Sequence, residues 1–448
     1  MKKQYFLNAN IVDPANSVEE LGGLIINENG KIEAIGKKVN KNNIPSREKF
    51  IDLKEKYIFP GLIDMRVFVG EPGFEYKENF KTLSNAALAG GVTSVVTMPN
   101  TSPVIDNVSM VDFLKRRGRD KSKINIYPTA TLTKNLEGNN MNEFGLLQKK
   151  GIIGFTDGIK TIQNTRVMSR IMKSAYDLNS LIIQHAEDFE LAKNGQVNDG
   201  IIATKLGLHG IPDYAEKIIV ERDLSLLQDY NCRYHISQIS SAKSLEVIKR
   251  SKENVNFTTG VSINNLSLNE NDIGDFRTFL KLSPPLRTED DRLSLIKGIN
   301  QDLIEVIVSD HKPEDEESKR LTFSQAATGA SGIETLLSLA LELFHNESLK
   351  LSKIIQCLTS NPAKILKIDK GSLSIGNDAD FCIVDLFKPW IVKKENMISK
   401  SKNTCIEDKK LQGKVLNTYI KGIELYLSLI HISEPTRLLS ISYAVFCL

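Results

Sequence analysis

Cysteine is scarce in this sequence, with five residues among 448, and no two of them have Cys-x-x-Cys spacing. Scattered cysteines argue against a disulfide framework and against a zinc ribbon, and they suit a reducing cytosol. The composition, 41% hydrophobic and 25% charged, is that of an ordinary globular protein. We therefore expect a cytoplasmic protein with a large core, long enough for one big domain and one small domain.

Long apolar runs and a strong net charge are also missing. No stretch of about 18 or more apolar residues occurs, so we expect no transmembrane helix. The formal net charge is only +3, which gives no indication of nucleic acid or a membrane surface as a partner. The first residues, MKKQYFLNANIVDP, become polar too early for a secretory signal peptide.

The last residues, 427–448, differ in composition from the rest of the chain. The stretch LSLIHISEPTRLLSISYAVFCL is nearly free of acidic residues, and its apolar residues follow neither the period of a strand nor that of a helix. A C-terminal amphipathic helix is one interpretation. We favour the other, a non-native tail, because the stretch resembles translated sequencing-adapter read-through.

The two ends of the remaining chain both read as short strands. In residues 1–55, Asn29-Gly30 stands between two alternating apolar runs, which predicts a β-hairpin. Residues 366–426 show similar alternation, in GSLSIGNDADFCIVDL and GKVLNTYIKGIELY. We expect one small β-sandwich domain that is formed by both termini.

Residues 56–365 alternate apolar strand-like runs with helical patterns. Typical runs are TSVVTMPN, SLIIQHAED and IEVIVSDH, and most are followed by a helix-like segment. This alternation indicates a parallel sheet, and about 300 residues of it suit a closed (β/α)8 barrel of the TIM type. A doubly wound open sheet is the rival α/β fold, but no GxGxxG turn is present.

Polar side chains follow many of the predicted strands, where the loops of a barrel form its active-site face. Two to four histidines and an aspartate in this arrangement would bind one or two Zn²⁺ ions and activate water. The candidates are Asp64, Arg66, Phe68, Glu71, Asn100, Asp157, His185, Glu187, His235, Gln238, Asp310 and His311.

A series of segments carries a family resemblance, and it runs in order over about 59–426. It includes PGLIDMRVFVGEPG, AALAGGVTSVVTMPNTSPVID, GFTDG, IIQHAED, RYHISQIS, LKLSPPLRTEDDR, VSDHKP and SKSKNT. These segments resemble the dihydroorotases of the cyclic amidohydrolase superfamily. The resemblance implies a zinc-dependent barrel with a small flanking sheet domain. It also implies a role in pyrimidine synthesis, where such enzymes interconvert carbamoyl aspartate and dihydroorotate.

Several functional positions of the family are replaced in this chain. The family's His-x-His is Arg66-Val67-Phe68 here, and the strand period of two places both side chains on the inward face. Neither arginine nor phenylalanine offers a lone pair to a metal, and the guanidinium charge would repel Zn²⁺. Four further positions stand where the family has a substrate-binding arginine, a metal-binding histidine, an asparagine and a substrate-binding histidine: Gly70, Gln238, Ser283 and Glu314.

Other family positions are retained. By resemblance, His185 and Asp157 match metal ligands, Asp310 matches the aspartate that is both ligand and general base, and Asn100 matches a substrate-binding asparagine. These residues form an incomplete metal site, so we expect zinc to bind weakly or not at all. A hydrogen-bonded network without a metal is the alternative interpretation. His235, three residues before Gln238, is expected to be structural.

The loss of the metal would leave carboxylates facing each other without a counter-charge. We therefore predict that Arg66 occupies part of the vacated metal space. Its guanidinium should lie within about 4 Å of the carboxylate of Asp310 or Asp157.

Three functions remain open from the sequence. The first is a dihydroorotase-like protein that has lost most or all hydrolysis and supports aspartate transcarbamoylase, a role implied only by its resemblance to non-catalytic dihydroorotase-like chains, some of which assemble with that enzyme. The second is an active dihydroorotase or related cyclic amidase with a reduced metal site at His185, Asp157 and Asp310. The third is a binding module for a small ligand that is not a dicarboxylate, because Gly70 removes a cation and Glu314 adds an anion. A homo-oligomer is compatible with each of them.

Overall fold

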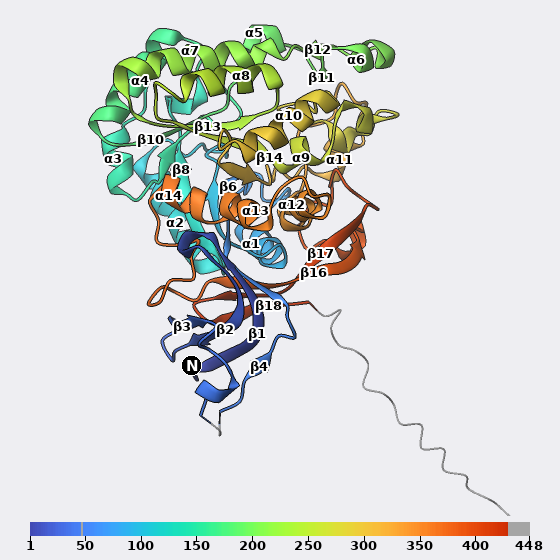
Figure 1. Ribbon diagram of the computed structural model, residues 1–448. Helices are drawn as coiled ribbons and strands as arrows, with labels where there is room; N and C mark the ends of the chain where they lie inside the picture. The colour runs from blue at the N-terminus through green and yellow to red at the C-terminus, as the bar shows by residue number, and fades with distance from the viewer. Residues whose placement is uncertain (46–47, 429–448) are drawn as a thin grey trace, which may run out of the picture.

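The computed structural model describes residues 1–45 and 48–428, which form an α/β barrel and a separate sheet built from both ends of the chain (Figure 1). The predicted fold class is confirmed. Most of the predicted non-native tail, residues 429–448, lies outside the described residues. Among the described residues, no helix combines the length and the apolar character needed to cross a membrane.

Eight parallel strands form the barrel. Neighbouring strands pair in chain order, and a parallel bridge between Val67 and His311 links the first strand to the chain just after the last one. At this closure the backbone N–H of Phe68 donates to the carbonyl of His311 at 2.9 Å. The strands are β6 (Leu62–Val67), β7 (Val92–Thr97), β8 (Asn125–Ala130), β9 (Gly154–Phe155), β10 (Leu181–Gln184), β13 (Arg233–Ile239), β14 (Thr258–Ser262) and β15 (Val306–Val308).

Helices cover the outside of the barrel (Figure 1). In the helix over Thr165–Asp177, Asn164 caps the first turn, and the buried side chains recur at the spacing of one helical face. The helices of this outer layer are α1 (Phe80–Ala89), α2 (Val108–Lys121), α3 (Phe144–Lys149), α4 (Thr165–Asp177), α7 (Tyr214–Tyr230), α8 (Ala242–Ser251), α10 (Glu289–Asn300), α12 (Leu336–His345), α13 (Leu351–Leu358) and α14 (Ser360–Leu366).

Short elements lie in the loops at the carboxyl ends of the barrel strands. Between β10 and α7, a two-stranded parallel sheet stands beside two short helices (Figure 1). These loop elements are α5 (Phe189–Ala192), β11 (Val197–Asn198), α6 (Ile201–Leu206), β12 (Gly210–Ile211), α9 (Ile263–Ser267) and α11 (Glu316–Lys319).

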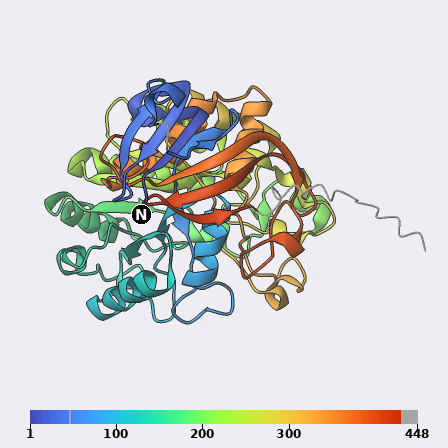
Figure 2. The same cartoon turned by 90° about the horizontal axis from the view of Figure 1, so that it is seen from below.

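The second sheet joins the two ends of the chain. Figure 2 shows the N-terminal strands in blue beside the C-terminal strands in red. The order is β18-β17-β16-β5-β1-β2-β3, with β4 also paired to β1. The strands are β1 (Gln4–Asp13), β2 (Val18–Ile26), β3 (Ile32–Gly36), β4 (Ile51–Asp52), β5 (Tyr57–Pro60), β16 (Phe381–Ile391), β17 (Lys410–Ile420) and β18 (Ile423–Leu427).

This sheet differs in detail from the predicted sandwich. Its eight strands form one hydrogen-bonded sheet, because β1 is long enough to pair with β4 near its start and with β5 further on. Strand β5 belongs to this sheet, so the sheet continues past residue 55 before the barrel begins at β6. The hairpin predicted at Asn29-Gly30 is confirmed, since β2 and β3 pair antiparallel and Gly30 has a φ of +74°.

The core of the terminal sheet explains why neither end forms it alone. Phe6, near the N-terminus, packs edge-on against Phe381 at 5.4 Å between ring centroids. Phe381 in turn stacks on Tyr419 at 4.5 Å. Both partners come from the C-terminal segment, so the apolar surface of each end is buried by the other.

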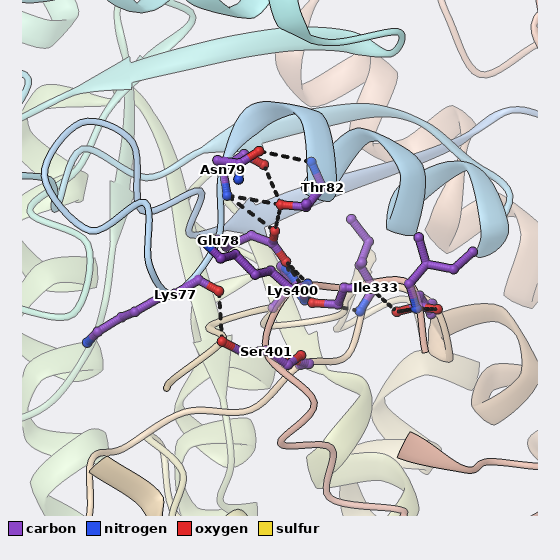
Figure 3. Close-up of polar contacts among 12 residues, drawn as sticks. Lys77, Glu78, Asn79, Thr82, Ile333, Lys400 and Ser401 are labelled. Carbon is purple, nitrogen blue, oxygen red and sulfur yellow. Dashed lines mark hydrogen bonds and ion pairs between the residues drawn. The ribbon is translucent and has the colours of Figure 1, made fainter. Parts of the chain in front are cut away.

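A buried carboxylate ties the barrel to the C-terminal segment. Glu78, just before α1, accepts hydrogen bonds from the Ser399 hydroxyl at 2.6 Å and the Lys400 backbone N–H at 3.2 Å. It also accepts bonds from the Asn79 N–H and the Thr82 hydroxyl (Figure 3). Glu78 thereby joins two segments that lie more than 300 positions apart in the chain.

Candidate functional site

Arg66, near the end of β6, lies inside the barrel and is 1% exposed. Its Nε donates to Oδ1 of Asp310 at 2.8 Å. Its Nη1 donates to the Ser237 hydroxyl at 2.9 Å and to the Gly158 carbonyl at 3.3 Å. The predicted pairing of Arg66 with a carboxylate is confirmed, and the carboxylate is that of Asp310.

Phe68 lies beside Arg66 in the same part of the barrel. The guanidinium carbon of Arg66 is 5.3 Å from the centre of the Phe68 ring, a distance typical of a cation–π contact. The pairing of β6 with β7 shifts register between Asp64 and Val67, at the position of Arg66. The two residues that replace His-x-His therefore pack against each other.

Asp310 follows β15 in a backbone conformation that L-residues rarely adopt, with a φ of +50°. Burial raises the pKa of its carboxyl group, although Arg66 opposes this shift. Gln238 and Ser283 lie nearby: Nε2 of Gln238 donates to the Ser283 carbonyl at 2.9 Å. These two replaced family positions thus contact each other.

His185, at the end of β10, is buried and uncharged at neutral pH. Burial lowers its pKa to about 3, and the charges of Arg66 and Lys312 add to this shift. Its Nε2 lies 3.4 Å from the Ser283 hydroxyl, and its Nδ1 has no hydrogen-bond partner among the described residues. An uncharged imidazole can bind a metal, but the nearest charges around this one are positive.

Asp157 and Asn100 take part in a different network. Oδ1 of Asp157 accepts the backbone N–H groups of Leu132 at 2.8 Å and Thr133 at 3.1 Å, and Oδ2 accepts the Thr133 hydroxyl at 2.5 Å. Burial raises the pKa of Asp157 to about 6. The Asn100 amide donates to the Asp157 carbonyl at 3.1 Å. The pairing of Asp157 with Arg66, left open from the sequence, is not found.

Glu314, which replaces a substrate-binding histidine of the family, is paired with two lysines. It is buried, and its carboxylate lies 2.5 Å from Nζ of Lys77 and 3.4 Å from Nζ of Lys312. Gly70 has a φ of +75°, and a Cβ there would come within 2.7 Å of the Phe74 carbonyl oxygen. An arginine at position 70 would therefore require this loop to change.

His235 has a structural environment, as expected. Its ring is buried, and Nδ1 is 2.8 Å from the Thr258 hydroxyl on β14. Burial lowers its pKa to about 3. No hydrogen bond joins its ring to Arg66 or Asp310 within the described residues.

A cavity of about 210 Å³ opens at the mouth of the barrel. It brings together Arg66, Asp310 and Ser283, and it excludes Asn100 and Asp157. We did not single out Lys281 and Lys312 from the sequence, although they lie two residues from Ser283 and Asp310. The lining residues are Arg66, Ile159, Glu187, Ala192, Gly195, Gln196, Ile211, Lys281, Leu282, Ser283, Asp310, Lys312, Thr328 and Gly329.

Comparison with known proteins identifies the family. A family model described as dihydro-orotase-like matches residues 55–244. The chain is 38% identical over 424 residues to a dihydroorotase of Ehrlichia canis, covering 94% of each protein. It is 38% identical over 417 residues to a dihydroorotase of Syntrophus aciditrophicus, covering 93% of this chain and 97% of that one. The chain belongs to the dihydroorotase family.

A solved structure agrees with the dihydroorotase family in fold. The L-hydantoinase (dihydropyrimidinase) from Arthrobacter aurescens superposes with a TM-score of 0.84 over 95% of this chain and 96% of that chain. Its sequence is only 22% identical, so this likeness concerns the fold alone. The barrel and the terminal sheet therefore both belong to the fold that the two chains share.

The dihydroorotase resemblance implies zinc, but the residues of this chain do not fit the ion. Within residues 1–45 and 48–428, no group of three or more His, Cys, Asp or Glu side chains is placed to hold a metal. Asp157 uses both carboxylate oxygens for Leu132 and Thr133, and Asp310 is bonded to a guanidinium. Arg66 places a fixed positive charge next to His185. The hydrogen bonds of Asp157 and the ion pair of Asp310 would have to break before the two carboxylates could share a metal.

Glu187 should make the stability of the protein depend on pH. Burial raises its pKa to about 7 from an ordinary value of 4.5. Between these values the folded chain holds the proton that the unfolded chain has lost, so the free energy of unfolding falls as pH rises. Glu187→Gln should remove this dependence and stabilise the protein by about 2–3 kcal/mol at pH 8, with little effect at pH 4.

Urea unfolding of the unchanged protein and of Glu187→Gln at pH 4, 6 and 8 measures how the free energy of unfolding depends on pH. Glu190→Gln is the matched control, because Glu190 lies three residues away and is exposed. An equal effect of Glu187→Gln at all three pH values would contradict the prediction.

Proposed function

We propose that this chain is a dihydroorotase homologue of pyrimidine biosynthesis that has lost most or all hydrolysis and has a structural role beside aspartate transcarbamoylase. The single observation that supports the loss of hydrolysis is the buried contact between Arg66 and Asp310, at 2.8 Å. By resemblance, Asp310 is the residue that would act as ligand and general base. Here its carboxylate is already paired with the guanidinium of Arg66. Unlike a metal ion, a guanidinium does not bind and activate a water molecule.

The energetics of this contact oppose a catalytic role for Asp310. Both side chains are almost fully buried, so separating them would leave two charges without compensation in a medium of low polarity. A general base must also accept a proton, but hydrogen bonding to Arg66 favours the carboxylate form that is already paired. Activation of water would have to come from elsewhere in the cavity.

The structural role beside aspartate transcarbamoylase comes from the family resemblance. Co-purification of the two proteins, followed by measurement of the mass of the complex, tests it. A complex of defined stoichiometry supports the role. Two separate species at micromolar concentrations would contradict it, and a homo-oligomer would appear in the same measurement.

Dihydroorotate hydrolysis tests the loss of activity. The chain ending after Ser428 and the full chain, each supplied with zinc, should give no turnover above the buffer rate. Asp310→Ala is the control for catalysis. Asp310→Asn is the second control, because it keeps a side chain of similar shape beside Arg66. Turnover that disappears in both variants would mean that a reduced metal site at His185, Asp157 and Asp310 works, as in the alternative hypothesis.

A further inference from the structure

The proposed function gives no role to the barrel-mouth cavity, although charged residues of both signs line it. Its volume of about 210 Å³ corresponds to about seven water molecules, since each occupies about 30 Å³ in the liquid. This space suits a small metabolite rather than a peptide or a nucleotide. Three of its residues, Glu187, Lys281 and Lys312, carry charges that the Arg66–Asp310 pair does not neutralise.

Glu187 supplies the negative side of the cavity. It follows β10, and its backbone is held by the Thr161 hydroxyl and the Gln163 amide. Its carboxylate, by contrast, has no hydrogen bond and no ion pair within the described residues. A largely buried carboxylate without a partner is costly, and a ligand that donates hydrogen bonds to it would offset that cost.

Lys281 and Lys312 supply the positive side. Lys312 follows β15, which is separated from β10 by two other strands of the barrel. Nζ of Lys281 donates only to the Ser324 carbonyl, at 2.9 Å, and no carboxylate pairs with it among the described residues. Lys312 shares the single carboxylate of Glu314 with Lys77. This side of the cavity therefore carries a surplus of positive charge.

We propose that the cavity binds a small zwitterion, such as an amino acid, with its ammonium group on Glu187 and its carboxylate on Lys281 and Lys312. Ammonium groups have three donors for a carboxylate, and lysine ammonium groups bind carboxylates in the same way. A dicarboxylate is disfavoured, because its second carboxylate would face Glu187. The inference rests on the proposed function in one respect: the cavity holds this ligand without hydrolysing it.

Isothermal titration of the full-length protein at pH 8 with matched pairs of compounds tests the inference. The zwitterions are glycine, β-alanine and 4-aminobutyrate, which differ in the spacing of their charges. The corresponding acids without the amino group are acetate, propionate and butyrate. At least one zwitterion should bind about tenfold or more tightly than its matched acid. The charge spacing of the zwitterion that binds best indicates the distance between Glu187 and the two lysines.

Two variants assign the two ends of the ligand. Glu187→Gln should reduce the affinity for the best zwitterion to that of its matched acid, and Lys281→Met should weaken zwitterion and acid alike by about tenfold. Glu190→Gln, on the same loop but exposed, should change neither. Glu187→Gln removes an unpaired charge from a half-buried side chain, so the variant should remain folded, and its circular dichroism spectrum verifies this.

Three results would overturn the inference: equal binding of zwitterion and acid in all three pairs, unchanged binding in Glu187→Gln, or no saturable binding of any probe at millimolar concentrations. None of these compounds contains a ring amide that can be hydrolysed. Failure of the titration is therefore distinct from failure of the proposed function, which turnover of dihydroorotate or the absence of a complex with aspartate transcarbamoylase would reveal.

Discussion

Arg66→Met is expected to lower the free energy of unfolding by about 3–5 kcal/mol. The substitution keeps an unbranched side chain next to Phe68 but removes the charge that Asp310 faces. Asp310 is buried, so its carboxylate would remain in the barrel without compensation. The Ser237 hydroxyl and the Gly158 carbonyl would lose their donor as well. Urea unfolding at pH 8 measures the effect.

A double-mutant cycle separates the ion pair from packing. Asp310→Asn alone should also destabilise, because it leaves the guanidinium of Arg66 unpaired. The double variant Arg66→Met/Asp310→Asn should be more stable than the sum of the single effects implies, since neither charge remains. Arg119→Met, at a side chain that is 75% exposed, is the control and should change stability little. Strict additivity in the cycle would contradict a direct ion pair.

The contact between Arg66 and Asp310 could be predicted from the sequence because it follows from a general requirement. A buried charge needs a partner, and the i, i+2 spacing on a strand placed Arg66 toward the barrel interior. The carboxyl ends of parallel strands brought Asp310 to the same face. The alternation of strands and helices likewise predicted a parallel α/β fold, and its length together with the missing GxGxxG turn favoured the barrel over an open sheet.

The environments of Asp157 and Glu314 could not be predicted in the same way. The donors for Asp157 are backbone N–H groups of residues 132 and 133, and every non-proline residue carries such a group, so the sequence gives no signal. Lys77, the partner of Glu314, lies 237 positions away in the chain. Its pairing depends on how two loops meet at the barrel mouth, and periodicity contains no information about that.

The cavity charge of Glu187 illustrates an intermediate case. Its place after an apolar strand made it a candidate from the sequence. What the sequence did not indicate was that its carboxylate would remain without a partner while the neighbouring acidic positions Asp157 and Glu314 acquired theirs. A charged residue at a barrel mouth is therefore a candidate for ligand binding mainly when the fold leaves its charge without a partner.

Glu78→Ala is expected to lower the free energy of unfolding by about 4 kcal/mol and to loosen residues 398–403. Burial alone would raise the pKa of Glu78, but the His311 ring, whose Nε2 lies 3.7 Å from the carboxylate, and hydrogen bonds from Ser399 and Thr82 hold the pKa below its ordinary value. The carboxylate is therefore ionised and accepts four hydrogen bonds, including those of Asn79 and Lys400 (Figure 3). Truncation to alanine leaves the Ser399 hydroxyl and the Lys400 N–H without an acceptor, whereas the Asn79 N–H and the Thr82 hydroxyl keep their bonds to each other's residue.

Urea unfolding and limited proteolysis measure the two effects of Glu78→Ala separately. Ser401 keeps its bond to the Lys77 carbonyl at 2.7 Å, so we expect local opening near Lys400 before global unfolding. Cleavage after Lys400 or Lys402 should then become faster while the barrel stays intact. Glu75→Ala, three positions earlier and exposed, is the matched control. A loss of stability without faster cleavage there would mean that Glu78 stabilises the start of α1 alone, and that the C-terminal segment is held to the barrel by other contacts.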